Sequence, residues 1–145
     1  MRINTYFVVI VALVLSCSIQ DNEHRKAIER LKKVASEHYE QRNYSEAYND
    51  YAELVKLDSS NNEFHFRKAR AAASLKLDEE ARKGFLRSIE KKYREADSYY
   101  NIGLTYLFKD NSLATNYFEE CLKIEPNHQE AIQVLNSLKE NSKTQ

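Results

Sequence analysis

Residues 103–126 read GLTYLFKDNSLATNYFEECLKIEP and carry small, aromatic and turn-forming residues at fixed spacing: Gly103, Tyr106, Ala114, Phe118, Cys121 and Pro126. The same spacing, apart from one extra residue between the second and third positions, occurs twice upstream, as Ala69, Ala72, Ala81, Phe85 and Ser88, and as Ala35, His38, Ala47, Tyr51 and Leu54. The first members of the three sets, Ala35, Ala69 and Gly103, are separated by 34 residues. A constant period of this length predicts a stack of helical hairpins in which each unit buries its face on the next.

Small residues stand where the two helices of each unit are expected to cross. On the first helix they are Ala35, Ala69 and Gly103, and on the second they are Ala47, Ala81 and Ala114. A larger side chain at these positions would push the helix axes apart. Aromatic residues at Tyr51, Phe85 and Phe118 are expected to fill the gap to the next unit.

From about Ile28 to Glu140 this pattern resembles the tetratricopeptide repeat family. The resemblance implies an all-α fold, a right-handed α-solenoid of three helix-turn-helix units followed by a C-terminal capping helix. The capping helix has Ala131, Ile132, Leu135 and Leu138 on one side and polar residues on the other, as the open end of a solenoid requires. The third unit departs from the family pattern because it is one residue short between Tyr106 and Ala114.

The N-terminus carries an apolar run, Tyr6 to Leu15, after the basic residue Arg2. A membrane-spanning helix needs about 20 apolar residues, so this shorter run is typical of a secretory signal. The run ends in Val14-Leu15-Ser16-Cys17, which resembles a bacterial lipobox. The resemblance implies cleavage before Cys17 and lipidation of its sulfur. An ordinary signal peptide and a short N-terminal anchor are the alternatives.

These observations predict a division of the chain into seven segments. They are a lipoprotein signal peptide (1–16), a lipidated tether (17–23), three repeats (24–61, 62–95 and 96–127), a capping helix (128–140) and a disordered tail (141–145). The first helix is expected to start at about His24, and Asp78 is expected to cap the fourth.

In the tetratricopeptide family the first helix of each unit lines a concave groove, and the resemblance carries that role onto this chain by register. The groove residues it implies are Lys32, Tyr39, Phe66, Arg70, Tyr100, Leu104, Leu107 and Phe108. Aromatic residues and arginine often dominate recognition. Leu104, Leu107 and Phe108 would form an apolar strip, which is either a ligand face or a contact with the capping helix or with a second copy.

A specialised subfamily clamps a C-terminal carboxylate with Lys, Asn and Arg at set groove positions. Lys32 matches one of these positions, whereas the other positions hold Ser36, Arg67, Asp97 and Asn101. A clamp of that kind is therefore not expected. Outside the groove, a basic run on the second helix of the middle unit is either a solvated face or a contact for anionic lipid headgroups: Arg82, Lys83, Arg87, Lys91, Lys92 and Arg94.

The chain shows no catalytic motif and no pattern of metal ligands. The four histidines have no partners at metal-ligand spacing, and there is no Gly-rich phosphate loop or nucleophile elbow. We therefore expect no enzyme activity, no cofactor and no metal. The 22 basic and 22 acidic residues give a net charge of zero, which does not indicate nucleic acid binding. Cys121, with Cys17 assigned to lipid, is expected to be a small buried apolar residue.

The sequence thus predicts a lipid-anchored adaptor that binds a segment of a partner protein and helps to assemble a bacterial envelope complex. The expected place is the outer membrane, facing the periplasm. Two alternatives remain open: a surface-exposed lipoprotein that binds a host or external ligand, and a structural lipoprotein that self-associates. The oligomeric state is not predicted.

Overall fold

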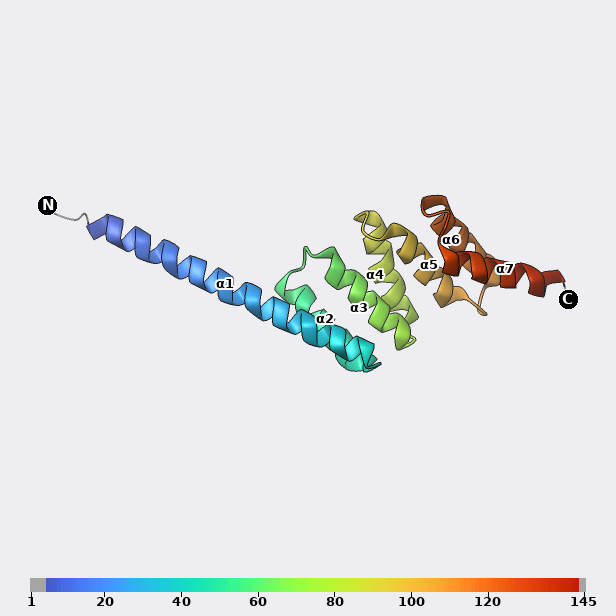
Figure 1. The fold of residues 1–145 in the computed structure, drawn as a ribbon, viewed down its shortest axis with the longest axis horizontal. Coiled ribbons are helices and arrows are strands. Elements are labelled where there is room, and N and C mark those ends of the chain that lie inside the picture. Colours follow the sequence, from blue (N-terminus) through green and yellow to red (C-terminus); the bar gives the residue numbers. More distant parts are fainter. Residues whose placement is uncertain (1–4, 144–145) are drawn as a thin grey trace.

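The computed structural model describes the backbone of residues 5–143 and the side chains of residues 18–140. Within these bounds the chain forms helices and no strand (Figure 1). The helices are α1 (Thr5–Glu40), α2 (Tyr44–Leu57), α3 (Asn62–Ser74), α4 (Asp78–Glu90), α5 (Glu95–Tyr106), α6 (Asn111–Ile124) and α7 (Gln129–Lys143). Each helix packs on its neighbours in sequence, and α3 also contacts α5. The all-α solenoid of three hairpins and a capping helix is confirmed.

The small residues at the predicted helix crossings are buried. Ala35, Ala47, Ala81 and Ala114 have no exposed surface, and Ala69 and Gly103 are also buried. At Gly103 a Cβ atom would lie 2.6 Å from Cε1 of Phe118, so the ring of Phe118 packs directly on the α5 backbone. The periodicity therefore marked the positions where the helices approach most closely.

Side chains cap the N-termini of α3 and α6. The Oδ1 atom of Asn61 accepts a hydrogen bond from the backbone N–H of Glu63 (3.0 Å), and Asp110 caps α6 in the same way through Leu113 (2.9 Å). The prediction that Asp78 is an N-cap is wrong, because Leu77 occupies that position without a capping side chain. Asp78 is instead in the first turn, where its carboxylate pairs with Lys109.

The first helix is longer than expected. It begins at Thr5 rather than at about His24, and residues 18–23, expected to be a tether, are helical. No Gly or Pro interrupts the chain between residues 5 and 40, so nothing in this segment stops the helix. Figure 1 shows the N-terminal half of α1 projecting beyond the other helices. Among the described residues, no helix combines the length and the apolar character needed to span a bilayer.

The third hairpin differs from the first two at its turn. Helix α5 ends at Tyr106, so Leu107 and Phe108 lie beyond the helix on which the register placed them. Phe108 has a φ of 66° and an exposed side chain, and its N–H donates to Oδ1 of Asn111 (2.9 Å). The third unit has one residue fewer than the other two between Tyr106 and Ala114, and this explains the change. The shorter connection must still keep Ala114 and Phe118 in register with Gly103, so α5 ends early.

The C-terminal helix covers the open end of the solenoid. Ala131 and Leu135 are buried, and Leu135 packs in a cluster with Ala114 and Phe118 of α6. The helical backbone continues to Lys143, past Asn141, where we expected it to fray. The remaining predicted tail residues, 144–145, lie outside the described residues, as does the side chain of Cys17.

Candidate functional site

Two adjoining cavities lie on the side of the solenoid formed by the first helices of the hairpins. The first cavity, of about 280 Å³, is lined by Tyr39, Arg70, Ala73, Ser74, Lys76, Asp78, Asn101, Leu104 and Thr105. The second, of about 200 Å³, is lined by Phe66, Arg70, Arg94, Asp97, Tyr100, Asn101, His128 and Glu130. Arg70 and Asn101 belong to both cavities. We call the two cavities together the inner groove.

The first cavity is built around Arg70. Its guanidinium carbon lies 5.0 Å from the centre of the Tyr39 ring, and the hydroxyl of Tyr39 is 3.5 Å from Oγ of Ser74. Within the described part of the chain, no carboxylate lies within ion-pair distance of Arg70 or Lys76. The stacked guanidinium therefore keeps its N–H donors available for a ligand.

An apolar side chain stands beside these cations. Leu104, on α5, is 39% exposed and lines the first cavity. Asn101, one turn earlier, has its Nδ2 bound to the backbone oxygen of Asp97 (2.7 Å), which leaves its carbonyl oxygen as an acceptor. The first cavity thus offers positive charge, an apolar contact and a hydrogen-bond acceptor within one groove.

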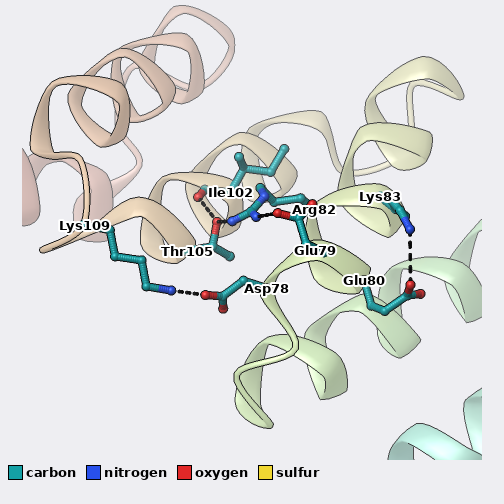
Figure 2. A network of polar contacts seen from close by, with 8 residues as sticks. All are labelled: Asp78, Glu79, Glu80, Arg82, Lys83, Ile102, Thr105 and Lys109. Carbon is teal, nitrogen blue, oxygen red and sulfur yellow. Dashed lines mark hydrogen bonds and ion pairs between the residues drawn. The ribbon is translucent and has the colours of Figure 1, made fainter.

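Polar contacts between α4 and α5 hold the wall of the first cavity in place (Figure 2). Arg82 donates to Oγ1 of Thr105 (3.2 Å), pairs with Glu79 and lies 4.7 Å from the centre of the Tyr106 ring. Asp78 pairs with Lys109 across the same boundary. Arg82 was expected on the outside with the rest of the basic run, but its side chain is largely buried in this contact.

The second cavity is more polar and more fully paired. Nε of Arg94 donates to Oδ2 of Asp97 (2.8 Å), and this hydrogen bond raises the pKa of the guanidinium. The same guanidinium lies 5.0 Å from the centre of the Phe66 ring. The ring centre of Tyr100 is 4.9 Å from that of His128, and burial raises the pKa of the Tyr100 hydroxyl.

The structure brings some of the predicted groove residues together and separates others. Tyr39, Arg70 and Leu104 share the first cavity, and Tyr100 joins Arg70 in the second. Phe66 lines the second cavity, but it is only 1% exposed and packs in the core against Phe85. We therefore reassign it from ligand contact to support for the groove floor.

Lys32 lies outside both cavities. Its Nζ donates to Oε2 of Glu63 (3.0 Å), and this hydrogen bond raises the pKa of the ammonium group. The contact joins α1 to α3. Because Glu63 also pairs with Arg67 (3.4 Å), Lys32 belongs to a cluster of charges that holds the first two units together.

Leu107 and Phe108 lie away from the inner groove. They line an apolar cavity of about 200 Å³ with Gln133, Val134, Ser137 and Leu138 of α7. Leu107 packs in the cluster around Leu135, whereas Phe108 is 86% exposed. The predicted strip of three apolar residues is therefore divided, with Leu104 in the groove and the other two residues beside the capping helix.

Sequence reasoning missed several residues of the inner groove, and three of them have basic side chains. Lys76 lies in the turn after α3, Arg94 in the connection before α5, and His128 before α7. All three lie outside the first helices whose register implied the groove. Lys76 and Arg94 have positive φ angles of 62° and 47°, a backbone state that no Gly or Asn marks at these positions.

Among the residues whose side chains are described, Cys121 is the cysteine. Cys121 is fully buried, and burial together with the charge of Glu125 raises the pKa of its thiol to about 11, so it packs as an apolar residue. Within the described part of the chain, no three His, Cys, Asp or Glu side chains gather as metal ligands do.

The helical hairpins and the open inner groove define a repeat solenoid of the protein-interaction class. Two profiles described as tetratricopeptide repeat match the sequence, one over residues 33–99 and the other over residues 96–128. The chain belongs to the tetratricopeptide repeat family. No curated protein matches it.

Solved structures share the fold at low sequence identity. The TPR domain of Arabidopsis OM64 is 20% identical, with a TM-score of 0.72 over 81% of this chain and 98% of that one. The first TPR of Spaghetti (RPAP3), bound to the HSP90 peptide SRMEEVD, is 22% identical, with a TM-score of 0.69 over 79% and 91%. YrrB, described as a TPR protein with an unusual peptide-binding site, is 20% identical, with a TM-score of 0.66 over 80% and 68%.

Proposed function

We propose that this protein is a non-enzymatic, membrane-anchored adaptor that binds a segment of a partner protein in its inner groove. The observation that carries the proposal is the position of Arg70. Its guanidinium stacks on the Tyr39 ring, has no ion-pair partner among the described residues, and lines the same cavity as the exposed Leu104. A cation and an apolar contact in one groove fit an extended segment with an acidic and an apolar side chain. The peptide complex of the RPAP3 repeat supports this use of the fold.

The segment that we propose is not a chaperone tail held by the family's carboxylate clamp. Lys32 matches a clamp position, but it is bonded to Glu63 and lies outside the groove cavities. The free cations, Arg70 and Lys76, lie at the first cavity instead. We therefore propose a ligand that is anchored between the second and third repeats.

We propose the bacterial envelope as the place of action, with the lipid on Cys17 as the anchor and assembly of an envelope complex as the role. The lipobox-like run up to Cys17 supports the anchor. The expected side is the periplasmic face of the outer membrane, with the cell surface and an external ligand as the alternative. If protease digests the protein in intact cells, the protein is exposed on the cell surface and not on the periplasmic side.

Self-association through the apolar cavity beside α7 is the second candidate function. Phe108, 86% exposed over that cavity, is the observation in its favour. Sedimentation of the chain from Ser18 onward tests it, because a strict monomer at high concentration removes this role.

Site-specific photo-crosslinking in cells tests the groove. A photoreactive residue in place of Leu104 should give an adduct with a different protein, whereas one in place of Leu86, exposed on α4, should not. If position 104 gives no adduct, the groove is not the binding site. If position 108 links the chain to itself, self-association is favoured.

A further inference from the structure

A third cavity lies across α2, α3 and α4, on a different face of α3 from the inner groove. It measures about 200 Å³ and is lined by Tyr48, His65, Lys68, Ala69, Ala72, Glu80, Lys83, Gly84 and Arg87. On α3 its residues are His65, Lys68, Ala69 and Ala72, which share one helical face, whereas the groove residues Phe66, Arg70 and Ala73 share another. We call this third cavity the cationic pocket.

Positive charge exceeds negative charge in the cationic pocket. Lys68, Lys83 and Arg87 face a single acid, Glu80, whose carboxylate lies 3.4 Å from Nζ of Lys83 (Figure 2). The Nζ atom of Lys68 lies 5.0 Å from the centre of the Tyr48 ring. Among the described residues, no carboxylate is within ion-pair distance of Lys68 or Arg87. The pocket therefore retains uncompensated positive charge.

One backbone oxygen fixes two of the basic side chains. The carbonyl oxygen of Ser59 accepts hydrogen bonds from Nη2 of Arg87 (3.1 Å) and from Nε2 of His65 (3.0 Å). The Nε–H of Arg87 is buried and has no acceptor among the described residues. A buried donor without an acceptor costs free energy, and an anionic oxygen would remove that cost.

The floor of the pocket is apolar and tightly packed. A Cβ atom on Gly84 would lie 2.6 Å from Cβ of Ala69, so the absence of a side chain lets α4 approach α3 closely. This approach places Lys83 and Arg87 of α4 around the same cavity as Lys68 of α3.

We infer that the cationic pocket binds a phosphoryl group, as a site separate from the groove of the proposed function. The Nη2 atom of Arg87 already donates a hydrogen bond to the backbone oxygen of Ser59. Not all donors of the guanidinium are therefore available for the two-bond geometry in which arginine usually binds a carboxylate. The cations instead surround the cavity from two helices, which suits the several oxygens of a phosphoryl group. The cavity is smaller than the pockets of about 300 Å³ or more that take drug-sized ligands, and this fits a headgroup-sized anion.

Titration of the full chain, held in neutral detergent micelles, tests the site by amide NMR. Inorganic phosphate should shift the backbone amides of Lys68, Gly84 and Arg87 in a saturable way. Lys68→Gln should weaken the binding roughly tenfold, because it removes a charge that has no protein carboxylate partner. Lys91→Gln combined with Lys92→Gln removes two exposed charges of the same basic run outside the pocket, and should change the affinity less than about twofold.

Comparing two variants separates an effect on the site from an effect on folding. Arg87→Gln should also weaken phosphate binding, but it removes the bond to Ser59 as well and can loosen the turn before α3. Among the described residues, Lys68→Gln breaks only the contact with the Tyr48 ring, so its thermal unfolding should match that of the unsubstituted chain. Weakening by Lys68→Gln at unchanged stability supports the site.

Two sources of the phosphoryl group are separated by comparing probes. If monomeric short-chain phosphatidylglycerol binds the pocket more tightly than inorganic phosphate, a lipid headgroup is the ligand, and the reverse order indicates a soluble phosphate ester. Either order supports the site. The inference is overturned if neither probe shifts these amides, if an acidic peptide shifts them and phosphate does not, or if the Lys91 and Lys92 variant loses binding as Lys68→Gln does.

Discussion

The guanidinium carbon of Arg70 lies 5.0 Å from the centre of the Tyr39 ring, so a cation of the second repeat rests on an aromatic ring of the first. The contact orients the guanidinium at the junction of the two groove cavities without using a carboxylate. A stacked guanidinium keeps its in-plane N–H donors, so the arrangement prepares Arg70 for an acidic group on a ligand.

Replacement of Arg70 should therefore weaken partner binding. We expect Arg70→Gln to lower the affinity for the captured segment roughly tenfold, the usual cost of losing a charge-assisted hydrogen bond. Fluorescence anisotropy with a labelled peptide from the captured partner measures the change. Arg67→Gln, on the same helix but paired with Glu63 (3.4 Å) outside the cavities, is the matched control. Equal losses in the two variants would show that general charge, and not the groove, attracts the ligand.

The separation of Leu104 from Phe108 gives a second prediction. Leu104→Asp should reduce capture of the partner strongly, because it places a carboxylate beside Arg70 and removes the apolar contact. Phe108→Asp should leave capture nearly unchanged, because Phe108 lies beside α7 and outside the inner groove. A pull-down from envelope extract, with helicity checked by circular dichroism, compares the two. The prediction fails if the Phe108 variant loses the partner and the Leu104 variant keeps it.

The fold was predictable because the 34-residue spacing reports a packing constraint. Ala35, Ala69 and Gly103 are small where the helices cross, and the structure buries all three. The turn of the third unit was less predictable, because a one-residue deletion can be absorbed in a helix or in a loop. The structure absorbs it by ending α5 at Tyr106, which removes Leu107 and Phe108 from the helical register.

The candidate site was predictable only in part, for a similar reason. Tyr39, Arg70 and Leu104 lie on the first helices, and helical register places them on the groove side. Lys76 and Arg94 project from connections, where no periodicity applies. Phe66 shares the register of the groove, yet it is buried because Tyr93 and Arg94 cover its ring. Covering by a loop residue cannot be deduced from helix spacing.

The assignment of Cys17 as the lipid site is a prediction about the anchor. Cys17→Ser should remove the acylated sulfur and release the protein into the soluble fraction of broken cells, because stable anchoring depends on the acyl chains. Cys121→Ala, at the buried cysteine, should leave the protein in the membrane fraction. Fractionation and intact-mass spectrometry provide the readout. Retention of the Cys17 variant in the membrane would exclude lipidation as the anchor.

The contact between Gly103 and Phe118 predicts a measurable cost for a single methyl group. A Cβ at Gly103 would come within 2.6 Å of the ring, so Gly103→Ala should lower the free energy of unfolding by roughly 1 to 3 kcal/mol, despite the better helix propensity of Ala. Asn116→Ala, at an exposed position of α6, should be nearly neutral. Adding Phe118→Leu should relieve the clash, so in urea unfolding the two changes should be less harmful together than their sum.

The buried thiol of Cys121 predicts how stability depends on alkaline pH. Burial raises its pKa from an ordinary value of 9.0 to about 11, so between these values the unfolded chain has lost the proton and the folded chain keeps it. The unfolded state then binds fewer protons, and the free energy of unfolding falls as pH rises. The contribution is fully present below about pH 9 and is lost as pH rises through about 11, with a total of roughly 2 to 3 kcal/mol.

Cys121→Ala is the matched variant for this pH dependence, since Ala is small and apolar and carries no ionisable group. It should be close to the unsubstituted chain in stability near neutral pH and should lose less stability between pH 9 and pH 11. Burial is the largest cause of the raised pKa of Tyr100 and acts in both proteins, so most of its effect cancels in the comparison. The smaller contribution that the charge of Cys121 makes to this shift is lost with the thiol. Urea unfolding across this pH range measures the difference. Parallel curves would mean that the thiol ionises as easily in the folded protein as in the unfolded chain, and Cys121 would then be accessible to solvent.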